Sequence, residues 1–451
     1  MKRMILFALL ITLLVSLSGC FLEPAENLYA IPKQSSDYYE LQSAIEKAMP
    51  EGASYCPPTA GDNQQSVQLA DLDGDGRDEA VVYLKTTGST PLSVCVFGKR
   101  EGKYSLIAKV DFAGSSFAHV GQDISIISFD HVEYVQIDGT AGNELVIGRQ
   151  ISDQVAQTLG VYALRGDALQ ELLTANYSEF ITADLNEDGN RDLVLLRADT
   201  EQLGVAEYYH WKEDQLLRER EASMTAAVTA VRRIITGKMC ESVPAVFVAS
   251  EFGEGTIVTD IFGLRGREFV NLTLTEENAT GVKTVRDYYV YSNDIDSDGL
   301  IELPRLIALR EIEDDETSKN RSLICWYNLY PDGTERIKCL TYHNYSGGWY
   351  LEIPQQWEER LAVSRAAVYG TTLGYRFLLA DENGASELFS LTAVSGDDAA
   401  QMLQEGSWQR LTEKGDQIYL CAIADTTRLD FETLQHMFHF IRVDWKTGET
   451  E

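Results

Sequence analysis

Short apolar runs alternate with polar turns along most of this chain, a pattern typical of antiparallel β-structure. Apolar segments at residues 80–84 and 193–196 each follow a stretch rich in Asp and Gly, and shorter apolar segments at 67–69 and 180–182 precede those stretches. We therefore expect each polar stretch to be the loop of a hairpin that joins two strands.

Three of these stretches, at residues 71–79, 184–192 and 294–302, share one pattern. Oxygen-bearing side chains stand at positions 1, 3, 5 and 9, and Gly stands at position 6, where the chain must turn sharply. Because Ca²⁺ takes about six to eight oxygen ligands in a flexible shell, the pattern predicts about three Ca²⁺ sites, each with a backbone carbonyl at position 7. The predicted ligands are Asp71, Asp73, Asp75, Arg77 (carbonyl) and Glu79; Asp184, Asn186, Asp188, Asn190 (carbonyl) and Asp192; and Asp294, Asp296, Asp298, Leu300 (carbonyl) and Glu302.

Two alternatives apply to these loops. An EF-hand uses similar positions but needs flanking helices and Glu at position 12, where this chain has Val82, Leu195 and Arg305. Asp and Gly also favour turns without any metal, although three loops in one register favour ligation.

The acidic loops, each followed by an apolar strand, resemble the FG-GAP or VCBS repeats of integrin α-like β-propellers, over roughly residues 60–345. The resemblance implies a mainly β, propeller-like array with a cation in the hairpin loop of a blade. Residues 135–144 and 236–244 look like copies that have lost most ligands. The ninth residues of successive copies lie roughly 48 to 65 residues apart, which gives about five repeats.

The N-terminus is typical of an exported lipoprotein. Lys2 and Arg3 precede an apolar stretch at residues 5–17, and Leu17-Ser-Gly-Cys20 resembles the lipobox of bacterial lipoproteins. We expect a signal peptide at 1–19, lipidation of Cys20 and a linker at 20–36, which would anchor the chain on the extracytoplasmic face of the cell membrane. The alternative is an uncleaved anchor.

Composition and charge indicate a globular protein that does not bind nucleic acid. Apolar residues make up 44% of the chain, ample for a core, and the net charge is −32. Such a charge disfavours nucleic acid, so we expect no nucleic-acid partner. The chain has seven Cys, and Pro331-Asp-Gly333 predicts a hairpin turn that would place Cys325 opposite Cys339. A disulfide is one outcome there, and two buried thiols are the other.

Two further segments lie outside the repeats. Residues 37–50 predict an amphipathic helix that packs against the repeats, because Leu41, Ala44, Ile45 and Ala48 share one face. Residues 346–451 mix helical and strand patterns, which predicts a small C-terminal α+β domain.

No catalytic site is selected by the sequence. His436 and His439 have the spacing of two metal ligands on one helix face, but apolar residues surround them. The chain has no nucleophile elbow, P-loop or paired-Cys zinc motif. We therefore expect a binding protein for a protein or glycan at the cell envelope, rather than an enzyme. The competing functions are a polysaccharide-directed hydrolase or lyase and an envelope scaffold without a small ligand.

Overall fold

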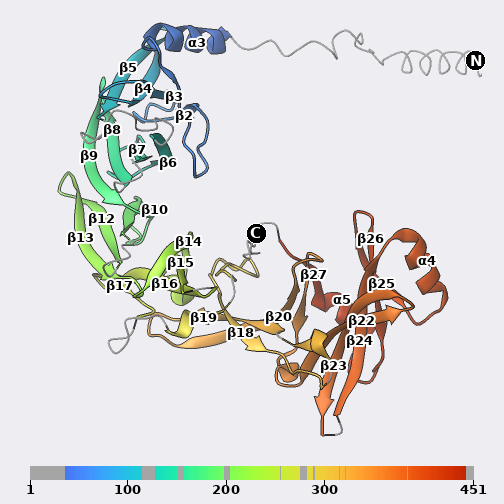
Figure 1. Ribbon diagram of the computed structural model, residues 1–451. Helices are drawn as coiled ribbons and strands as arrows, with labels where there is room; N and C mark the ends of the chain where they lie inside the picture. The colour runs from blue at the N-terminus through green and yellow to red at the C-terminus, as the bar shows by residue number, and fades with distance from the viewer. Residues whose placement is uncertain are drawn as a thin grey trace, which may run out of the picture. The chain divides into compact units, whose positions relative to one another are not determined.

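The computed structural model describes residues 36–113, 127–150, 157–197, 204–253, 255–274, 282–287, 290–313, 315–319, 321–382 and 384–442. The chain is mainly β and contains several antiparallel sheets (Figure 1). It divides into two compact units, residues 1–131 with 164–170, and residues 132–163 with 171–451. No helix within the described ranges is long and apolar enough to cross a membrane. The expected signal peptide, Cys20 and the linker lie outside the described residues.

In the first unit, helix α3 (Ser36–Ala48) precedes a five-stranded sheet of order β1-β3-β4-β5, in which β2 also pairs with β3. The helix lies close to the predicted range of 37–50, and it buries Ile45 against Val82, Cys95 and Phe97 of the sheet. The strands are β1 (Ser54–Tyr55), β2 (Val67–Ala70), β3 (Glu79–Lys85), β4 (Leu92–Arg100) and β5 (Lys103–Phe112).

Three four-stranded sheets follow, and in each of them the strand order follows the chain. Their strands are β6 (Ser128–Val135), β7 (Glu144–Gln150), β8 (Gln157–Arg165) and β9 (Ala168–Tyr177); β10 (Glu179–Ala183), β11 (Asp192–Arg197), β12 (Val205–Lys212) and β13 (Gln215–Ser223); and β14 (Val228–Lys238), β15 (Pro244–Phe252), β16 (Ile257–Arg265) and β17 (Glu268–Asn271). Hairpin loops join the first and second strands, as the acidic pattern predicted for residues 184–192.

The second strand of each sheet is an apolar run because both of its faces are covered. In β11, Leu193 and Leu195 belong to the core that includes Val146 of β7. Val194 and Leu196 belong to a different core, which includes Val248 of β15. Successive sheets of the second unit therefore pack face to face through separate apolar layers.

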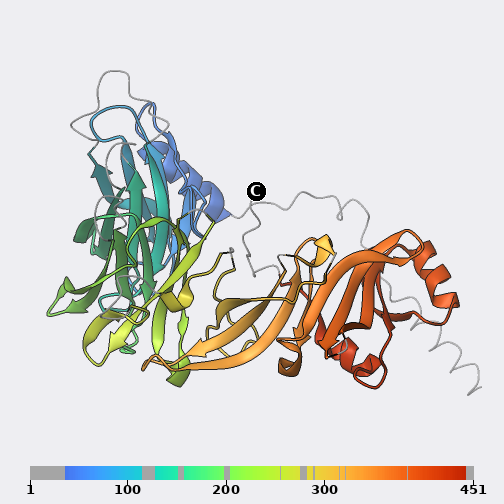
Figure 2. The same cartoon turned by 60° about the horizontal axis from the view of Figure 1, so that its bottom comes forward.

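The fifth sheet has the order β18-β19-β20-β21-β27, and the sixth has the order β22-β23-β24-β26-β25. Their strands are β18 (Leu303–Ala308), β19 (Ser322–Leu329), β20 (Glu335–Asn344), β21 (Trp349–Ile353), β27 (Phe438–Phe440), β22 (Leu361–Tyr369), β23 (Thr372–Asp381), β24 (Gly384–Val394), β25 (Gln409–Lys414) and β26 (Gln417–Ile423). Helices α4 (Gly396–Gln404) and α5 (Phe431–Met437) follow β24 and β26. The two sheets lie side by side in both views and share one large core (Figures 1 and 2).

Strand pairing crosses the expected domain boundary at residue 346. β21 pairs with β20, and β27, from near the C-terminal end of the described chain, pairs with β21. The hairpin from β20 to β21 turns within a few residues, so β21 continues the meander, and β27 covers its outer edge. The mixed segment therefore contributes two strands to the fifth sheet in addition to the sixth sheet and both helices.

The expected pairing of Cys325 with Cys339 is wrong. Tyr330 donates its N–H to the carbonyl of Thr334 at 2.9 Å, as the turn requires, but Lys338 is an extra residue in β20 and shifts the register. Cys325 therefore pairs with Leu340, while Cys339 pairs with Trp326. A one-residue shift moves a side chain to the other face of the sheet, so the two free thiols join different cores.

Candidate metal sites

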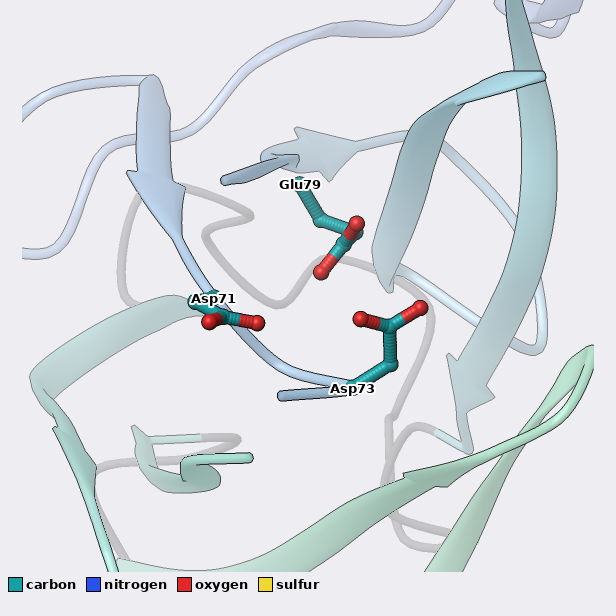
Figure 3. A group of neighbouring side chains, drawn as sticks. All are labelled: Asp71, Asp73 and Glu79. Carbon is teal, nitrogen blue, oxygen red and sulfur yellow. The ribbon is translucent and has the colours of Figure 1, made fainter. Parts of the chain in front are cut away.

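The loop at residues 71–79 brings three carboxylates together. Oxygen atoms of Asp71, Asp73 and Glu79 all lie within 4.8 Å of one another. Figure 3 shows these carboxylates turned toward a common point between the loop and the start of β3. The donors are hard oxygens at the sequence spacing predicted for Ca²⁺, so their chemistry fits that ion.

Position 1 of each acidic loop fixes the turn. The carboxylate of Asp71 accepts the N–H groups of Gly74 at 2.7 Å and Gly76 at 3.0 Å. Gly76 has a φ of 82°, a conformation in which other residues are strained. In the other loops, Gly189 and Gly299 donate to the position 1 carboxylates of Asp184 and Asp294, at 3.0 Å each.

Position 9 carries a buried carboxylate that closes the loop from inside. In each loop it accepts the N–H group of the residue at position 2, so that the ninth residue holds the second in place. These bonds are Leu72 to Glu79 at 3.0 Å, Leu185 to Asp192 at 2.9 Å and Ile295 to Glu302 at 3.0 Å. Burial raises the pKa of Asp192 and that of Glu302 to about 7, while the accepted N–H bonds oppose that rise.

Positions 5 and 7 form part of the turn. The position 5 carboxylate accepts the N–H group of the position 7 residue in all three loops. These bonds join Arg77 to Asp75 at 2.8 Å, Asn190 to Asp188 at 2.8 Å and Leu300 to Asp298 at 2.9 Å. Asp75 and Asp298 are not members of the convergent groups, so the described geometry assembles positions 1, 3 and 9 but not position 5.

The loop at residues 184–192 differs from the first. Its side-chain amide at position 3, Asn186, donates to Asp188 at 2.9 Å and to Asp192 at 3.5 Å. This amide therefore occupies carboxylate oxygens of Asp188 and Asp192 that a cation would need as ligands. Within the described ranges, the groups of three or more acidic, His or Cys side chains that could hold an ion are those at residues 71–79 and 294–302.

The loop at residues 294–302 brings Asp294, Asp296 and Glu302 within 4.8 Å of one another. It also receives a side chain from another strand, because Nζ of Lys338 lies 2.5 Å from Asp296 and 2.6 Å from Asp298. The ammonium lowers the pKa of Asp298. Sequence reasoning missed Lys338, because its position depends on the extra residue in β20.

The two segments that lack a full set of acidic residues also form hairpins. Glu144, at position 9 of the copy at residues 135–144, accepts the N–H groups of Ile137 at 2.7 Å and Asp138 at 3.2 Å. Gln136, at position 1, donates to the carbonyls of Thr140 and Ala141 instead of offering a carboxylate. The copy at residues 236–244 contains a short 3₁₀ turn, Cys240–Ser242. The hydrogen bond from the position 2 N–H to the position 9 carboxylate therefore forms even where other metal ligands are missing.

His436 and His439 do not share a helix face. Helix α5 ends at Met437, and His439 lies on β27. There its ring stacks on Tyr350, and its Nε2 lies 3.4 Å from Glu352. The strand conformation after Met437 therefore removes the helical two-histidine site.

Comparison with known proteins gives only distant likenesses. No family model matches the sequence, and no curated protein matches it. Among solved structures, the exotype rhamnogalacturonan lyase YesX is 11% identical with a TM-score of 0.28, over 76% of this chain and 69% of that chain. A Bacillus licheniformis rhamnogalacturonan lyase is 10% identical with a TM-score of 0.30, over 74% and 71%. The exo-β-1,3-galactanase of Phanerochaete chrysosporium is 10% identical with a TM-score of 0.24, over 76% and 79%. Likenesses this weak establish neither a shared fold nor a shared activity.

Proposed function

We propose that this protein is a lipid-anchored extracytoplasmic protein whose propeller-like repeats are stabilised by Ca²⁺ and which binds a protein or glycan at the cell envelope. The observation that supports the metal is the convergence of positions 1, 3 and 9 in the loops at residues 71–79 and 294–302. Bound Ca²⁺ would offset the repulsion among these carboxylates and favour the ionised form of each buried acid at position 9.

The role of the metal in this proposal is structural. Asp71 and Asp294 already orient their turns through backbone N–H groups, and Glu79 and Glu302 tie each loop to the strand that follows. A cation held at the same point would make the hairpin ends rigid. Such ends, repeated along an array of sheets, suit a surface that binds a large partner.

Isothermal titration of the metal-stripped mature chain with Ca²⁺ tests the proposal. We expect binding that the double variant Asp73→Ala and Asp296→Ala removes. A wild-type chain that takes up no Ca²⁺ at millimolar concentrations would refute the metal sites. Extracellular Ca²⁺ modules commonly bind at about 10⁻⁴ to 10⁻³ M, so the titration must reach that range.

The lipid anchor rests on the resemblance of residues 17–20 to a lipobox. Cys20→Ser should leave the precursor uncleaved or release the protein into the medium, because the thiol that accepts the lipid is gone. Metabolic labelling with a fatty acid and fractionation of the cells measure both effects. Retention of a cleaved, unlabelled Cys20→Ser chain in the membrane would contradict the proposal.

The polysaccharide-directed enzyme remains the competing function. Rhamnogalacturonan and β-1,3-galactan, the polymers in the names of the structural neighbours, are suitable substrates for an assay. Release of new reducing ends, or of unsaturated products, would favour the enzyme over the binding protein. Binding of these polymers without cleavage would favour the binding function.

A further inference from the structure

A cavity of about 1190 Å³ lies within the second unit, beside strands β18 and β19. Its wall includes apolar side chains such as Phe252, Leu306 and Ile324, together with the rings of Tyr342 and His343. The volume is somewhat above the usual range of about 300–1,000 Å³ for small-molecule sites, which are mostly apolar with a few polar groups. No acidic loop contributes to this wall, so the cavity is separate from the candidate metal sites.

Arg286 lines the cavity and is held rigidly. Its backbone pairs with Ile257 through two hydrogen bonds, of 2.8 and 2.9 Å. Its side chain donates from Nη1 to the hydroxyl of Thr259 at 3.0 Å and to the carbonyl of Thr284 at 2.8 Å, and from Nε to the carbonyl of Val290. The guanidinium is therefore fixed in orientation, and only 4% of the residue is exposed to solvent.

This buried cation has no anionic partner in the described part of the chain. Its Nη2 atom has no hydrogen-bond partner there, and no carboxylate lies within ion-pair distance. Burial lowers the pKa of Arg286 to about 10, and the groups that oppose this fall are the tyrosines Tyr327 and Tyr291 rather than an acid. An unpaired buried charge is costly, so a protein with 70 acidic and 38 basic residues has placed an unusual group here.

The other two arginines of the wall are already engaged. Arg305 lies 2.5 Å from Glu335 and over the ring of Tyr327. Arg321 donates to the hydroxyl of Tyr342 at 2.7 Å and to the carbonyl of Thr317 at 2.6 Å. Asp287 and Glu311 also line the wall and offset part of its positive charge. A ligand with a single negative charge therefore suits the wall better than a phosphate dianion.

We propose that this cavity binds a small organic monocarboxylate, whose negative charge is balanced by the guanidinium of Arg286 and whose body packs against Phe252 and Leu306. The site needs neither Ca²⁺ nor the lipid anchor. It therefore goes beyond the proposed envelope function, and either proposal can fail without the other.

The test uses the mature chain and four probes in two matched pairs, galacturonate with galactose and benzoate with benzyl alcohol, at constant ionic strength. We expect at least one carboxylate to bind by calorimetry and to raise the melting temperature, while its neutral partner does neither. Inorganic phosphate serves as the dianion. Binding by phosphate with no binding by either carboxylate would overturn the proposal, as would the absence of binding by both carboxylates at millimolar concentrations.

Variants locate the site. Arg286→Gln should weaken the binding of that carboxylate by about tenfold or more, because the charge that balances it is lost. Ala308→Trp, at an exposed lining position, should block the cavity while Arg286 and its partners stay intact, and it decides the question if Arg286→Gln does not fold. Arg310→Gln is the matched control, because Arg310 is exposed and outside the lining. Unchanged affinity in Ala308→Trp would place the binding elsewhere and refute the proposal.

Discussion

The ammonium of Lys338 lies 2.5 Å from the carboxylate of Asp296, at position 3 of the loop that precedes β18. Lys338 is the extra residue of the irregular pairing between β19 and β20, and it also contacts Asp298 at 2.6 Å. The protein thus supplies its own cation to an acidic loop that resembles a Ca²⁺ site. A metal ion at Asp296 would have to displace this ammonium.

Removal of this lysine should strengthen metal binding at the loop. We expect Lys338→Met to lower the melting temperature without Ca²⁺, because Asp296 and Asp298 lose their counterion, and to increase the rise that Ca²⁺ produces. Melting curves with chelator and with Ca²⁺ measure both effects. Lys319→Met, which removes an exposed lysine paired with Glu316, is the control. An equal Ca²⁺ response in Lys338→Met and wild type would show that Lys338 does not compete with the metal.

Loss of one position 3 carboxylate should reduce the stabilisation by Ca²⁺. A ligand at about 100 times its dissociation constant stabilises the folded state by about 2.7 kcal/mol, so Asp73→Ala should lose most of that gain in the unit that contains residues 71–79. Asp111→Ala removes an exposed acid from β5 of the same unit and should keep the gain. Chemical denaturation with chelator and with Ca²⁺ gives the free energy of unfolding in each case. If chelation leaves wild-type stability unchanged, the loops are turns without a structural metal.

Glu144 should make stability depend on pH. Burial raises its pKa from 4.5 to about 7 in the folded state, so between these values the folded chain holds a proton that the unfolded chain has released. The stabilisation that this proton gives the folded state is complete below pH 4.5 and is lost as the pH rises through 7. Glu144→Gln should remove that loss and be more stable than wild type at pH 8, by on the order of 1 kcal/mol.

Urea unfolding at several values between pH 5 and 8 measures the effect of Glu144→Gln, and Glu268→Gln, at an exposed position of β17, is the matched control. The difference between Glu144→Gln and wild type should grow with pH, whereas the difference for Glu268→Gln should stay constant. A difference that shrinks with pH would show that the folded state stabilises the ionised form of Glu144.

The register of β19 and β20 predicts free thiols. Cys325 and Cys339 join different cores, so oxidation cannot link them without a shift of one strand. Thiol titration of the unfolded mature chain should detect all six cysteines beyond Cys20, and a reductant should leave the melting temperature unchanged. A mass lower by two hydrogens, with a tryptic link between the peptides of Cys325 and Cys339, would contradict this register.

The features that could be predicted from the sequence depend on contacts between residues that are close together in the chain. The acidic hairpins depend on contacts within nine residues, such as Gly76 with Asp71, so their positions can be read from spacing. The apolar run of β11 likewise predicts a strand that is covered on both faces. In the candidate sites, positions 1 and 3 and the buried acid at position 9 converge in the loops at residues 71–79 and 294–302, as the pattern requires.

The remaining features depend on distant segments. One extra residue, Lys338, moves Cys339 out of register with Cys325 and brings a cation to a loop 40 residues away, and no local pattern marks it. Pairing of β27 with β21 joins segments that the whole sixth sheet separates in the sequence. The burial of the Arg286 guanidinium without an acidic partner in the described chain can be recognised only after β16 and the segment around Val290 surround it. Such features follow from strand register rather than from composition.

Glu144 accepts the amide N–H of the second residue in a segment where Gln and Thr stand in place of other acids. A hairpin of this kind can therefore keep its shape without a full set of metal ligands. Searches of related genomes that demand a full cation signature would overlook such units, whereas a search for that single acid ahead of an apolar run would recover them.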